Sequence, residues 1–328
     1  MRTALLCLIC AAVLPAQSLK IYAIDTEGGK ATLYVTPNGE NMLIDTGYDG
    51  EKNRDAKRIA TVAAAAGVKR INHLVISHFH ADHAGGLKQL LQRLPVDRIY
   101  DHGESVEKGS AMFRDYSKAR RKLAHTILKA GDTVPVKGLQ VEVVSADGTA
   151  IAKPLAGAGQ PNPLCASFQK MEPDPGENAH SLALIITFGK LRISDLGDLY
   201  WNQEYDLACP ANKLGTVDLY MTTHHGTKTS GPPQIVHALR PRVVLMNNGP
   251  DKGGSVEALT TIRKSPGLTD VWQLHYSKIA GSALNSAEQF IANPSKRLDD
   301  EWLEVTGEQD GTLTLKNHRN GFTKTYRR

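Results

Sequence analysis

Three histidines and an aspartate stand within six residues, in the stretch HFHADH that runs from His78 to His83. An apolar strand-like run precedes them, so they are expected at the C-terminal end of a buried strand, where α/β sheets place their active sites. In an extended segment His78 and His80 point the same way, and two imidazoles suit an ion such as Zn²⁺. Asp82 and His83 can face a second ion, so that two metals hold the attacking and leaving oxygens of a hydrolysis. A polar turn without metal is the competing interpretation, which this spacing, followed by two glycines, does not favour.

The elements expected around this loop mix strands and helices. Hydrophobic patterns predict strands at residues 20–24, 31–36, 41–45, 71–78, 96–103, 138–148, 180–198 (a hairpin), 217–226, 241–249 and 271–275. Helices are predicted at residues 54–70, 84–94, 116–129, 233–239 and 256–264. Strands dominate the start of the chain and αβ units alternate later, which predicts sheets covered by helices in a layered α/β sandwich.

Two segments without helical or buried-strand patterning complete the outline. Residues Ala152 to Asn178 are rich in Pro, Gly and Asn, which predicts a long loop lying over a site. The stretch Trp302 to Tyr326 predicts a hairpin that turns at QDGT and packs on a sheet edge or on another subunit. No internal repeat or domain linker is evident, so residues 18–328 are predicted to form one domain that includes this hairpin.

The first seventeen residues have the pattern of an export signal. One arginine precedes a short apolar run that ends in PAQ, which predicts a signal peptide over residues 1–17 and a secreted or periplasmic protein. The run is shorter than the roughly 20 residues of a membrane span, although a retained anchor is the alternative. Cys165 and Cys209 remain after cleavage, and an oxidising compartment would permit a disulfide between them. Two buried thiols are the other interpretation.

The net charge of +5 describes a slightly basic surface. Binding of nucleic acid needs a concentrated basic patch, and the best local candidate, Lys118 to Lys129, has the pattern of an outer helix face. A nucleic-acid partner is therefore only weakly supported.

Several stretches together resemble the metallo-β-lactamase superfamily. They are HFHADH, the early turn IDTG from Ile44 to Gly47, the strand end ISDLGDLYW and the stretch TTHHGTKTSG. The last of these, with the opening YAIDTEGGKATLYVTPNGENMLIDTG, is similar to the DNA-internalisation competence branch and its extracellular relatives. The similarity covers about Leu19 to Gly254. It implies an αββα four-layer sandwich, in which two β-sheets pack together, helices lie outside and metals bind at one sheet edge.

The resemblance also implies the second half of the metal site. Asp198 would match the carboxylate that both metals share. In HHG, His225 is the favoured ligand and His224 would contact substrate or donate a proton, although the reverse assignment stays open. The expected cofactor is two Zn²⁺ ions, with Mn²⁺ or Fe as alternatives. The expected metal ligands are His78, His80, Asp82, His83, Asp198, His225 and, from its place in the pattern, His180.

The sequence departs from the family pattern at two places. His180 stands roughly where many members carry a metal histidine, but the competence branch often has other residues there, and a loop histidine is the alternative. That branch also carries Gly-His-Pro after the HHG strand, whereas the matching NNGPDKGG has no histidine, so one metal would have fewer protein ligands. His275 would either replace the missing ligand or be structural. Asp45 and Asp195 are expected either to orient ligands or to be structural, and His102 either lines the same edge or lies on the surface.

These residues predict hydrolysis without a serine or cysteine nucleophile. Two metals would activate a bridging hydroxide, Asp82 would orient it, and His224 would protonate the leaving group. The favoured function is a secreted phosphodiesterase or phosphoester hydrolase, with a small molecule or another phosphoester as substrate. One alternative is a hydrolase of amides, lactones or β-lactams. The other is a catalytically weakened metal- or ligand-binding protein, which the absent Gly-His-Pro histidine keeps open. The oligomeric state is not predicted.

Overall fold

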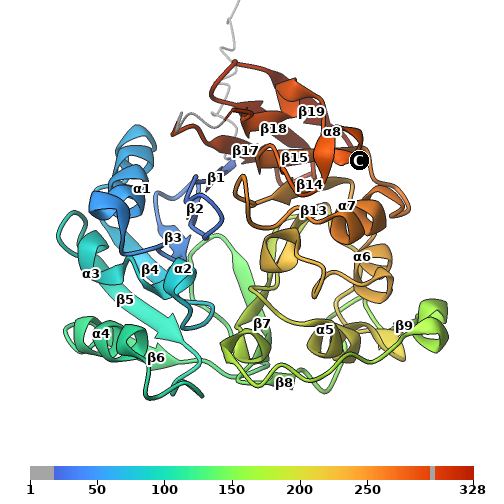
Figure 1. Ribbon diagram of the computed structural model, residues 1–328, viewed down its shortest axis with the longest axis horizontal. Helices are drawn as coiled ribbons and strands as arrows, with labels where there is room; N and C mark the ends of the chain where they lie inside the picture. Colours follow the sequence, from blue (N-terminus) through green and yellow to red (C-terminus); the bar gives the residue numbers. More distant parts are fainter. Residues whose placement is uncertain (1–17, 296–299) are drawn as a thin grey trace, which may run out of the picture.

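The computed structural model describes residues 18–295 and 300–328. The signal peptide predicted for residues 1–17 lies outside the described residues. In the described part of the chain, two large β-sheets pack against each other and helices cover their outer faces (Figure 1). The predicted αββα sandwich is confirmed.

The first sheet is formed by both ends of the described chain. Its central strands β1, β2 and β3 are antiparallel neighbours, and β3, β4, β5 and β6 run parallel. The C-terminal strands join it because β17 pairs with β1, so the predicted hairpin packs on a sheet edge. In spatial order the sheet contains β19 (Thr323–Tyr326), β18 (Leu313–Asn317), β17 (Leu303–Gly307), β1 (Leu19–Ala23), β2 (Thr32–Val35), β3 (Asn41–Ile44), β4 (Ile71–Val75), β5 (Val96–Asp101) and β6 (Ala124–Ile127).

The second sheet comes from the middle and late chain. Its antiparallel hairpin β10–β11 was predicted, and β11, β13, β14, β15 and β16 run parallel. A small separate pair joins β9 (Gln160–Pro161) to β12 (Ala211–Asn212). In spatial order the second sheet contains β16 (Ile291–Asn293), β15 (Asp270–His275), β14 (Val243–Met246), β13 (Leu219–Met221), β11 (Leu191–Asp195), β10 (Ala183–Phe188), β7 (Gln140–Ala146) and β8 (Thr149–Ala150).

Helices form the outer layers. The first sheet is covered by α1 (Arg54–Ala65), α2 (Ala81–Ala84), α3 (Leu87–Leu90) and α4 (Ala111–Arg120), and the second by α5 (Trp201–Ala208), α6 (Pro233–Leu239), α7 (Val256–Arg263) and α8 (Gly281–Leu284). The 3₁₀ turns are η1 (Glu51–Asn53), η2 (Pro163–Ser167), η3 (Glu177–His180), η4 (Thr223–Gly226) and η5 (Glu288–Phe290). No helix among the described residues is long and apolar enough to cross a membrane.

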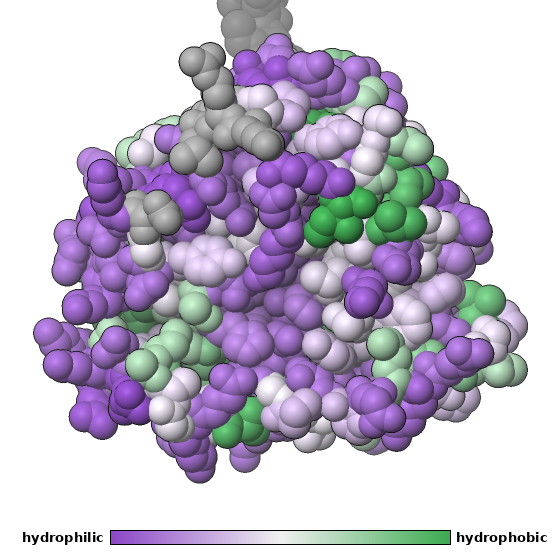
Figure 2. Space-filling view, in the orientation of Figure 1, coloured by the Kyte–Doolittle hydropathy of each residue, from purple (hydrophilic) through white to green (hydrophobic). Residues whose placement is uncertain are grey.

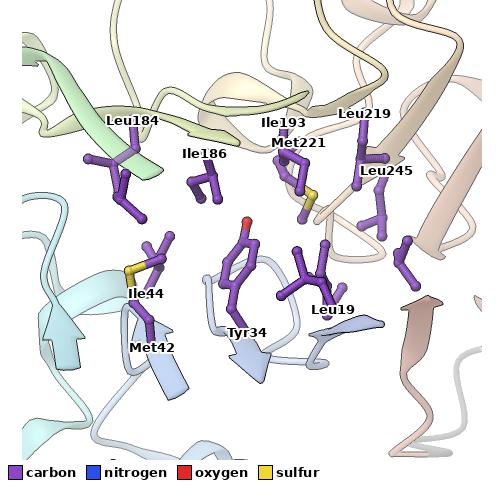
Figure 3. Packing of buried hydrophobic residues seen from close by; sticks show 14 of the residues in the cluster. Leu19, Tyr34, Met42, Ile44, Leu184, Ile186, Ile193, Leu219, Met221 and Leu245 are labelled. Atoms are coloured by element: carbon purple, nitrogen blue, oxygen red, sulfur yellow. The ribbon is translucent and has the colours of Figure 1, made fainter. Parts of the chain in front are cut away.

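Strand alternation explains how the layers form. In β3, Met42 and Ile44 point into the core between the sheets, whereas Leu43 between them packs on the helix side. Figure 3 shows side chains of the first sheet, such as Tyr34, facing Leu184 and Ile186 of the second. Because the side chains on both faces of these strands are apolar, each sheet must be covered on both faces. The other sheet covers one face and helices cover the other, so four layers result.

The order of strands brings distant loops to one end of the sandwich. Loops that follow β3 and β4 in the first sheet contact loops that follow β11 and β13 in the second. These loops carry the residues predicted to do chemistry, in agreement with the general placement of α/β sites beyond the carboxyl ends of strands. The face in Figure 2 is largely hydrophilic.

One predicted element is wrong. The helix expected from Tyr116 to Lys129 ends at Arg120, and Ala124–Ile127 forms the edge strand β6. An edge strand pairs along one side only, here with β5, and its residues are intermediate or exposed, so it lacks the buried pattern that identifies strands in sequence.

The long loop of residues 152–178 is anchored by a disulfide. Cys165 and Cys209 are bonded, with their Cα atoms 5.7 Å apart. The pairing that the sequence left open is therefore made, and it ties η2 to the end of α5.

Candidate metal centre

Among the described residues, four buried side chains could hold a metal ion together: Asp82, His83, Asp198 and His225, which we call the closed group. Their ligand atoms all lie within 4.8 Å of one another. Asp82 and His83 lie in α2, Asp198 follows β11, and His225 lies in η4. His83 and His225 are 142 positions apart in the sequence, so the group exists only because the two sheets pack together.

The distances within the closed group match a tetrahedral donor set. The Nε2 atom of His83 lies 3.2 Å from His225 Nε2, from Asp82 Oδ2 and from Asp198 Oδ2. His225 Nε2 lies 3.2 Å from Asp82 Oδ2 and 3.3 Å from Asp198 Oδ2. Tetrahedral ligands about 2.0 Å from a zinc ion lie about 3.3 Å from one another. These residues therefore fit a zinc-like ion.

Hydrogen bonds behind the rings turn ring nitrogens toward the site. Asp45 accepts hydrogen bonds from Ser77 Oγ and from His83 Nδ1, both at 2.8 Å. Since the only hydroxyl proton of Ser77 is used on Asp45, Ser77 Oγ accepts from His78 Nδ1 at 3.1 Å. His78, whose pKa burial holds well below its ordinary value, therefore carries its proton on Nδ1 and presents a bare Nε2 atom, as metal ligands do. Burial lowers the pKa of His83, but the charges of Asp198, Asp82 and Asp45 outweigh it and raise that pKa, so a metal ion on His83 Nε2 would displace a proton. Asp45 supports the ligands, which is one of its two expected roles.

His78 and His80 form a second set of donors, which we call the open pair. His78 Nε2 lies 3.1 Å from His80 Nδ1, and 4.0 Å from Asp198 Oδ2. The other nitrogen of His80 faces Glu107 Oε1 at 3.5 Å. Because His78 Nε2 is bare, it accepts a hydrogen bond from His80 Nδ1, and a metal ion held by both rings would displace that proton. Asp198 Oδ1 is buried and has no hydrogen-bond partner among the described residues, so it is an acceptor available to an ion.

The two carboxylates of the closed group stay ionised. Burial raises the pKa of Asp82, but the opposing charge of His83 and hydrogen bonds from His225 and His83 are stronger together and hold it well below its ordinary value. For Asp198, burial is opposed in the same way by His83, His225 and His224, and its pKa is also well below the ordinary value. Two buried, ionised carboxylates beside two imidazoles make a site where a divalent cation can replace the protons of the rings.

His224 lies beside the closed group but differs from its neighbour. Its Nδ1 lies 3.1 Å from Ser230 Oγ, which donates its own proton to the carbonyl of Leu199 at 2.7 Å, so Nδ1 of His224 must be the donor. Nε2 faces Asp198 Oδ2 at 3.7 Å. Burial lowers the pKa of His224 to about 4, so Nε2 is bare near neutral pH. The predicted proton donor must first take up a proton.

The backbone of the HHG turn is unusual at both histidines. His224 has φ 51° and His225 has φ 56°, in the left-handed region that residues other than glycine rarely adopt. Strained conformations of this kind gather at functional sites, where the surrounding structure holds them. They turn the two rings to different partners.

The glycines after the histidine motif allow two loops to pack closely. The helix α2 begins before them, at Ala81, and a Cβ atom on Gly86 would lie 2.1 Å from the carbonyl oxygen of Thr46. The absent side chain lets the metal loop pack on the turn that carries Asp45.

Two predicted candidates lie outside the closed group. His180 Nδ1 contacts Asp147 Oδ1 at 2.7 Å near the surface. His275 is buried, and its Nε2 lies 2.7 Å from Asp25 Oδ1. The other carboxylate oxygen of Asp25 pairs with Arg58. His275 therefore has the structural role that the sequence analysis held open. The closed group is complete without a ligand from NNGPDKGG.

The remaining candidates support the site from behind. Asp195 forms a buried ion pair with Lys30. His102 is buried rather than on the surface, and its Nε2 lies 3.1 Å from Glu177 Oε2. The same carboxylate accepts from the backbone N–H of Phe79, between the histidines of the open pair, at 3.3 Å.

Sequence reasoning missed Glu177 and Lys252. Glu177 connects the long loop to the metal loop, but a single glutamate in a Pro- and Gly-rich stretch carries no pattern. Lys252 contacts Asp82 Oδ2 through its ammonium group. It lies in NNGPDKGG, the stretch whose departure from the family pattern was the available signal.

Comparisons with known proteins agree with this geometry. The family model described as "Metallo-beta-lactamase superfamily" matches residues 25–155. Recombination protein 2 of Haemophilus influenzae is 25% identical over 231 residues, which are 70% of this chain and 24% of that protein. ComE operon protein 3 of Bacillus subtilis is 24% identical over 221 residues, 63% of this chain and 25% of that protein. The chain thus spans about a quarter of the length of these relatives.

Among solved structures, the metallo-beta-lactamase fold protein YhfI from Bacillus subtilis aligns with 78% of this chain and 95% of its own, at 11% identity and a TM-score of 0.46. The family-model match covers β2 to β8 and includes the whole HFHADH loop. The motif, the two-sheet fold and the family match over residues 25–155 agree: the chain is similar to the metal-dependent hydrolases of the metallo-β-lactamase superfamily, and its relatives include competence-type proteins.

Proposed function

We propose that this protein is a secreted, binuclear metal-dependent phosphodiesterase. The observation that carries the proposal is the closed group, whose five measured donor distances of 3.2–3.3 Å fit a tetrahedral ion. The open pair lies next to it and shares Asp198. Two ions held in this way would lie close enough to act on one substrate.

The ligands divide between the two sets of donors. His78 and His80 would hold one ion, Asp82, His83 and His225 would hold the other, and Asp198 would serve both. Zn²⁺ suits these nitrogen and carboxylate donors, and Mn²⁺ or Fe are the alternatives. When bound, such ions lower the pKa of water and stabilise negative charge on the reacting phosphoryl oxygens.

The protein's own groups would handle the protons. His224 presents a bare Nε2 beside Asp198 while its Nδ1–H is held by Ser230. We assign it the proton taken from the attacking water, which it then returns to the leaving oxygen, so that one residue serves as base and then as acid. Asp82 would accept a hydrogen bond from the same water and so orient it.

The choice of a phosphodiester rests on the relatives and on the motif. The match to Recombination protein 2 covers most of this chain, and recombination is a reaction of DNA, whose backbone is a phosphodiester. The competence-like HHG stretch favours the same class. This support extends to the bond and not to a particular substrate.

Export is part of the proposal. The signal peptide expected at residues 1–17 would direct it, and the Cys165–Cys209 disulfide supports an oxidising compartment such as the periplasm or the exterior.

Metal analysis combined with a substrate panel tests the proposed function. The panel is bis(p-nitrophenyl) phosphate, p-nitrophenylphosphorylcholine, single-stranded DNA and nitrocefin, each assayed with the zinc-loaded protein. We expect about two ions per chain and hydrolysis of at least one phosphodiester. Hydrolysis of nitrocefin alone would replace this function by the lactam alternative. Less than one ion per chain with no activity on any substrate would instead indicate a binding protein.

A further inference from the structure

Two lysines contact aspartates near the centre, and they differ in access to solvent. Lys30 pairs with Asp195, and both side chains are sealed, with 1% and 2% exposed. Lys252 pairs with Asp82, and 36% of its side chain is exposed. The first pair can only be structural. The second places an ammonium group at the open side of a proposed metal ligand.

The loop that carries Lys252 is fixed on both sides. Gly249 N–H donates to the carbonyl of Lys252 at 2.8 Å, and Gly254 N–H donates to the carbonyl of His225 at 2.9 Å. A Cβ atom on Gly28 would lie 2.9 Å from the Cβ of Lys252, so the glycine turn after β1 packs directly on the lysine stem. The backbone and the first part of the side chain of Lys252 are thus held in place independently of the contact between its ammonium group and Asp82.

The chemistry of the ammonium group leaves capacity for another acceptor. A lysine has three N–H donors, of which Asp82 Oδ2 takes one. Nζ lies 5.8 Å from the centre of the Tyr48 ring, which forms one wall. By comparison, only 13% of His224 and 3% of Asp198 are exposed. Within this cluster Lys252 is the positive group that an incoming substrate can reach.

We infer that Lys252 binds an anionic oxygen of the substrate and so selects phosphoesters, an inference that deepens the proposed phosphodiesterase function. An anionic oxygen on Lys252 would sit next to Asp82 and hence beside the closed group. A neutral amide or lactone would gain less from the same contact, because hydrogen bonds between charged partners are roughly twice as strong as neutral ones. The stretch NNGPDKGG thus supplies a substrate contact where the competence branch has Gly-His-Pro.

The test compares Lys252→Gln with Lys278→Gln in the zinc-loaded protein. Lys278 is a matched control because it follows β15 beside the same loop, is 37% exposed and pairs with an exposed aspartate, Asp251. Inorganic phosphate is titrated calorimetrically, and zinc content is measured on the same samples. We expect Lys252→Gln to weaken phosphate binding by about 10-fold or more, the loss of one charged hydrogen bond. The zinc content should stay unchanged in all variants. Lys278→Gln should keep the phosphate affinity of the wild type, and Lys252→Arg should keep much of it.

Two results would overturn the inference. Unchanged phosphate affinity in Lys252→Gln would mean that the lysine does not meet the anion. Loss of zinc in parallel with loss of phosphate would mean that it only positions Asp82. Phosphate binding that depends on Lys252 in a protein that hydrolyses no phosphodiester would reject the proposed function and keep the inference.

The same variants separate a small phosphodiester from nucleic acid. Bis(p-nitrophenyl) phosphate and a single-stranded oligonucleotide share the anionic oxygen, and both should bind less tightly to Lys252→Gln. Only the oligonucleotide should lose affinity steeply as salt rises, because many phosphates then release counterions. An equal response of both variants to either ligand would count against Lys252.

Discussion

The closed group and the open pair lie side by side and share Asp198, yet the protein encloses them to different degrees. The closed group brings four donors from both sheets within 4.8 Å of one another, and its most exposed side chain, Asp82, is 11% exposed. The open pair has two imidazoles from one loop, and His80 is 30% exposed. One set of donors is nearly complete from protein atoms, whereas the other leaves positions free.

This difference has a chemical meaning. Sites closed by four protein ligands hold zinc firmly, whereas catalytic sites keep a position for water or substrate. We therefore expect the closed group to hold its ion more tightly and the open pair to exchange its ion more readily. The missing Gly-His-Pro histidine does not weaken the closed group, because that group does not use the stretch.

The largest effect is expected from Asp198→Ala, since Asp198 belongs to both sets. Removing it should lower the metal content to below half of the wild-type value and reduce phosphodiesterase turnover by more than about 100-fold, which exceeds the usual loss for a residue that only supports a ligand. Elemental analysis and the bis(p-nitrophenyl) phosphate assay give the two readouts. Asp251→Ala, at an exposed position near the site, is the control. Unchanged turnover would reject the two-metal mechanism.

A smaller and asymmetric effect is expected from the single histidine variants. His225→Ala opens the closed group and should cost the tighter ion, whereas His80→Ala should cost only the weaker one. We measure this by zinc titration against a chelating indicator. In His225→Ala the affinity of the tighter step should fall by at least about 100-fold. In His80→Ala that step should be unchanged. Loss of the same step in both variants would show that the two sets bind as one unit.

The sequence predicted the open pair more directly than the closed group. HFHADH is local, so strand alternation and spacing suffice to identify His78 and His80. The closed group depends on Asp198 and His225, which only the family resemblance could place. Lys252 and Glu177 were not found because their partners Asp82 and Phe79 lie 170 and 98 positions away. A contact between residues so far apart in the chain produces no local or periodic pattern in the sequence.

The physical reason that made the buried strands predictable also explains why the edge strand β6 was mistaken for part of a helix at 116–129. Buried strands such as β3 alternate between two apolar environments, and this alternation is visible in the residues. The edge strand β6 has intermediate and exposed positions only, and its basic residues upstream resembled an outer helix face. The histidine in this strand, His125, contacts Asp101 at 2.8 Å, a tertiary contact that the sequence does not announce.

A moderate effect on stability is expected from the ionisation of Glu204, which lies beneath the turn that carries His224. Glu204 is fully buried and accepts from Gly231 N–H at 2.6 Å, and burial raises its pKa to about 8. Because this pKa exceeds its unfolded value of about 4.5, the folded state holds a proton that the unfolded state loses. The stability that the proton confers is full below about pH 4.5 and is lost as pH rises through about 8.

Glu204→Gln tests this linkage, since a neutral amide can still accept from Gly231. Between about pH 5 and 8 the wild type should lose on the order of 3 kcal/mol more unfolding free energy than the variant. Urea unfolding across that range measures the difference. Parallel pH profiles for the two proteins would mean that Glu204 ionises freely, and that the wall carrying His224 does not depend on a buried proton.

The smallest effect is expected from His180→Ala, which probes whether the open pair is truly open. His180 is 24% exposed and contacts Asp147, itself 62% exposed, and contacts of this kind at the surface contribute little. Zinc affinity should change by less than about two-fold, and His80→Ala, a histidine of similar exposure, provides the matched comparison. If His180→Ala instead loses zinc as His80→Ala does, His180 must leave Asp147 to complete the open pair when metal binds. The two sets of donors would then be equally enclosed, and the expected order of metal release would disappear.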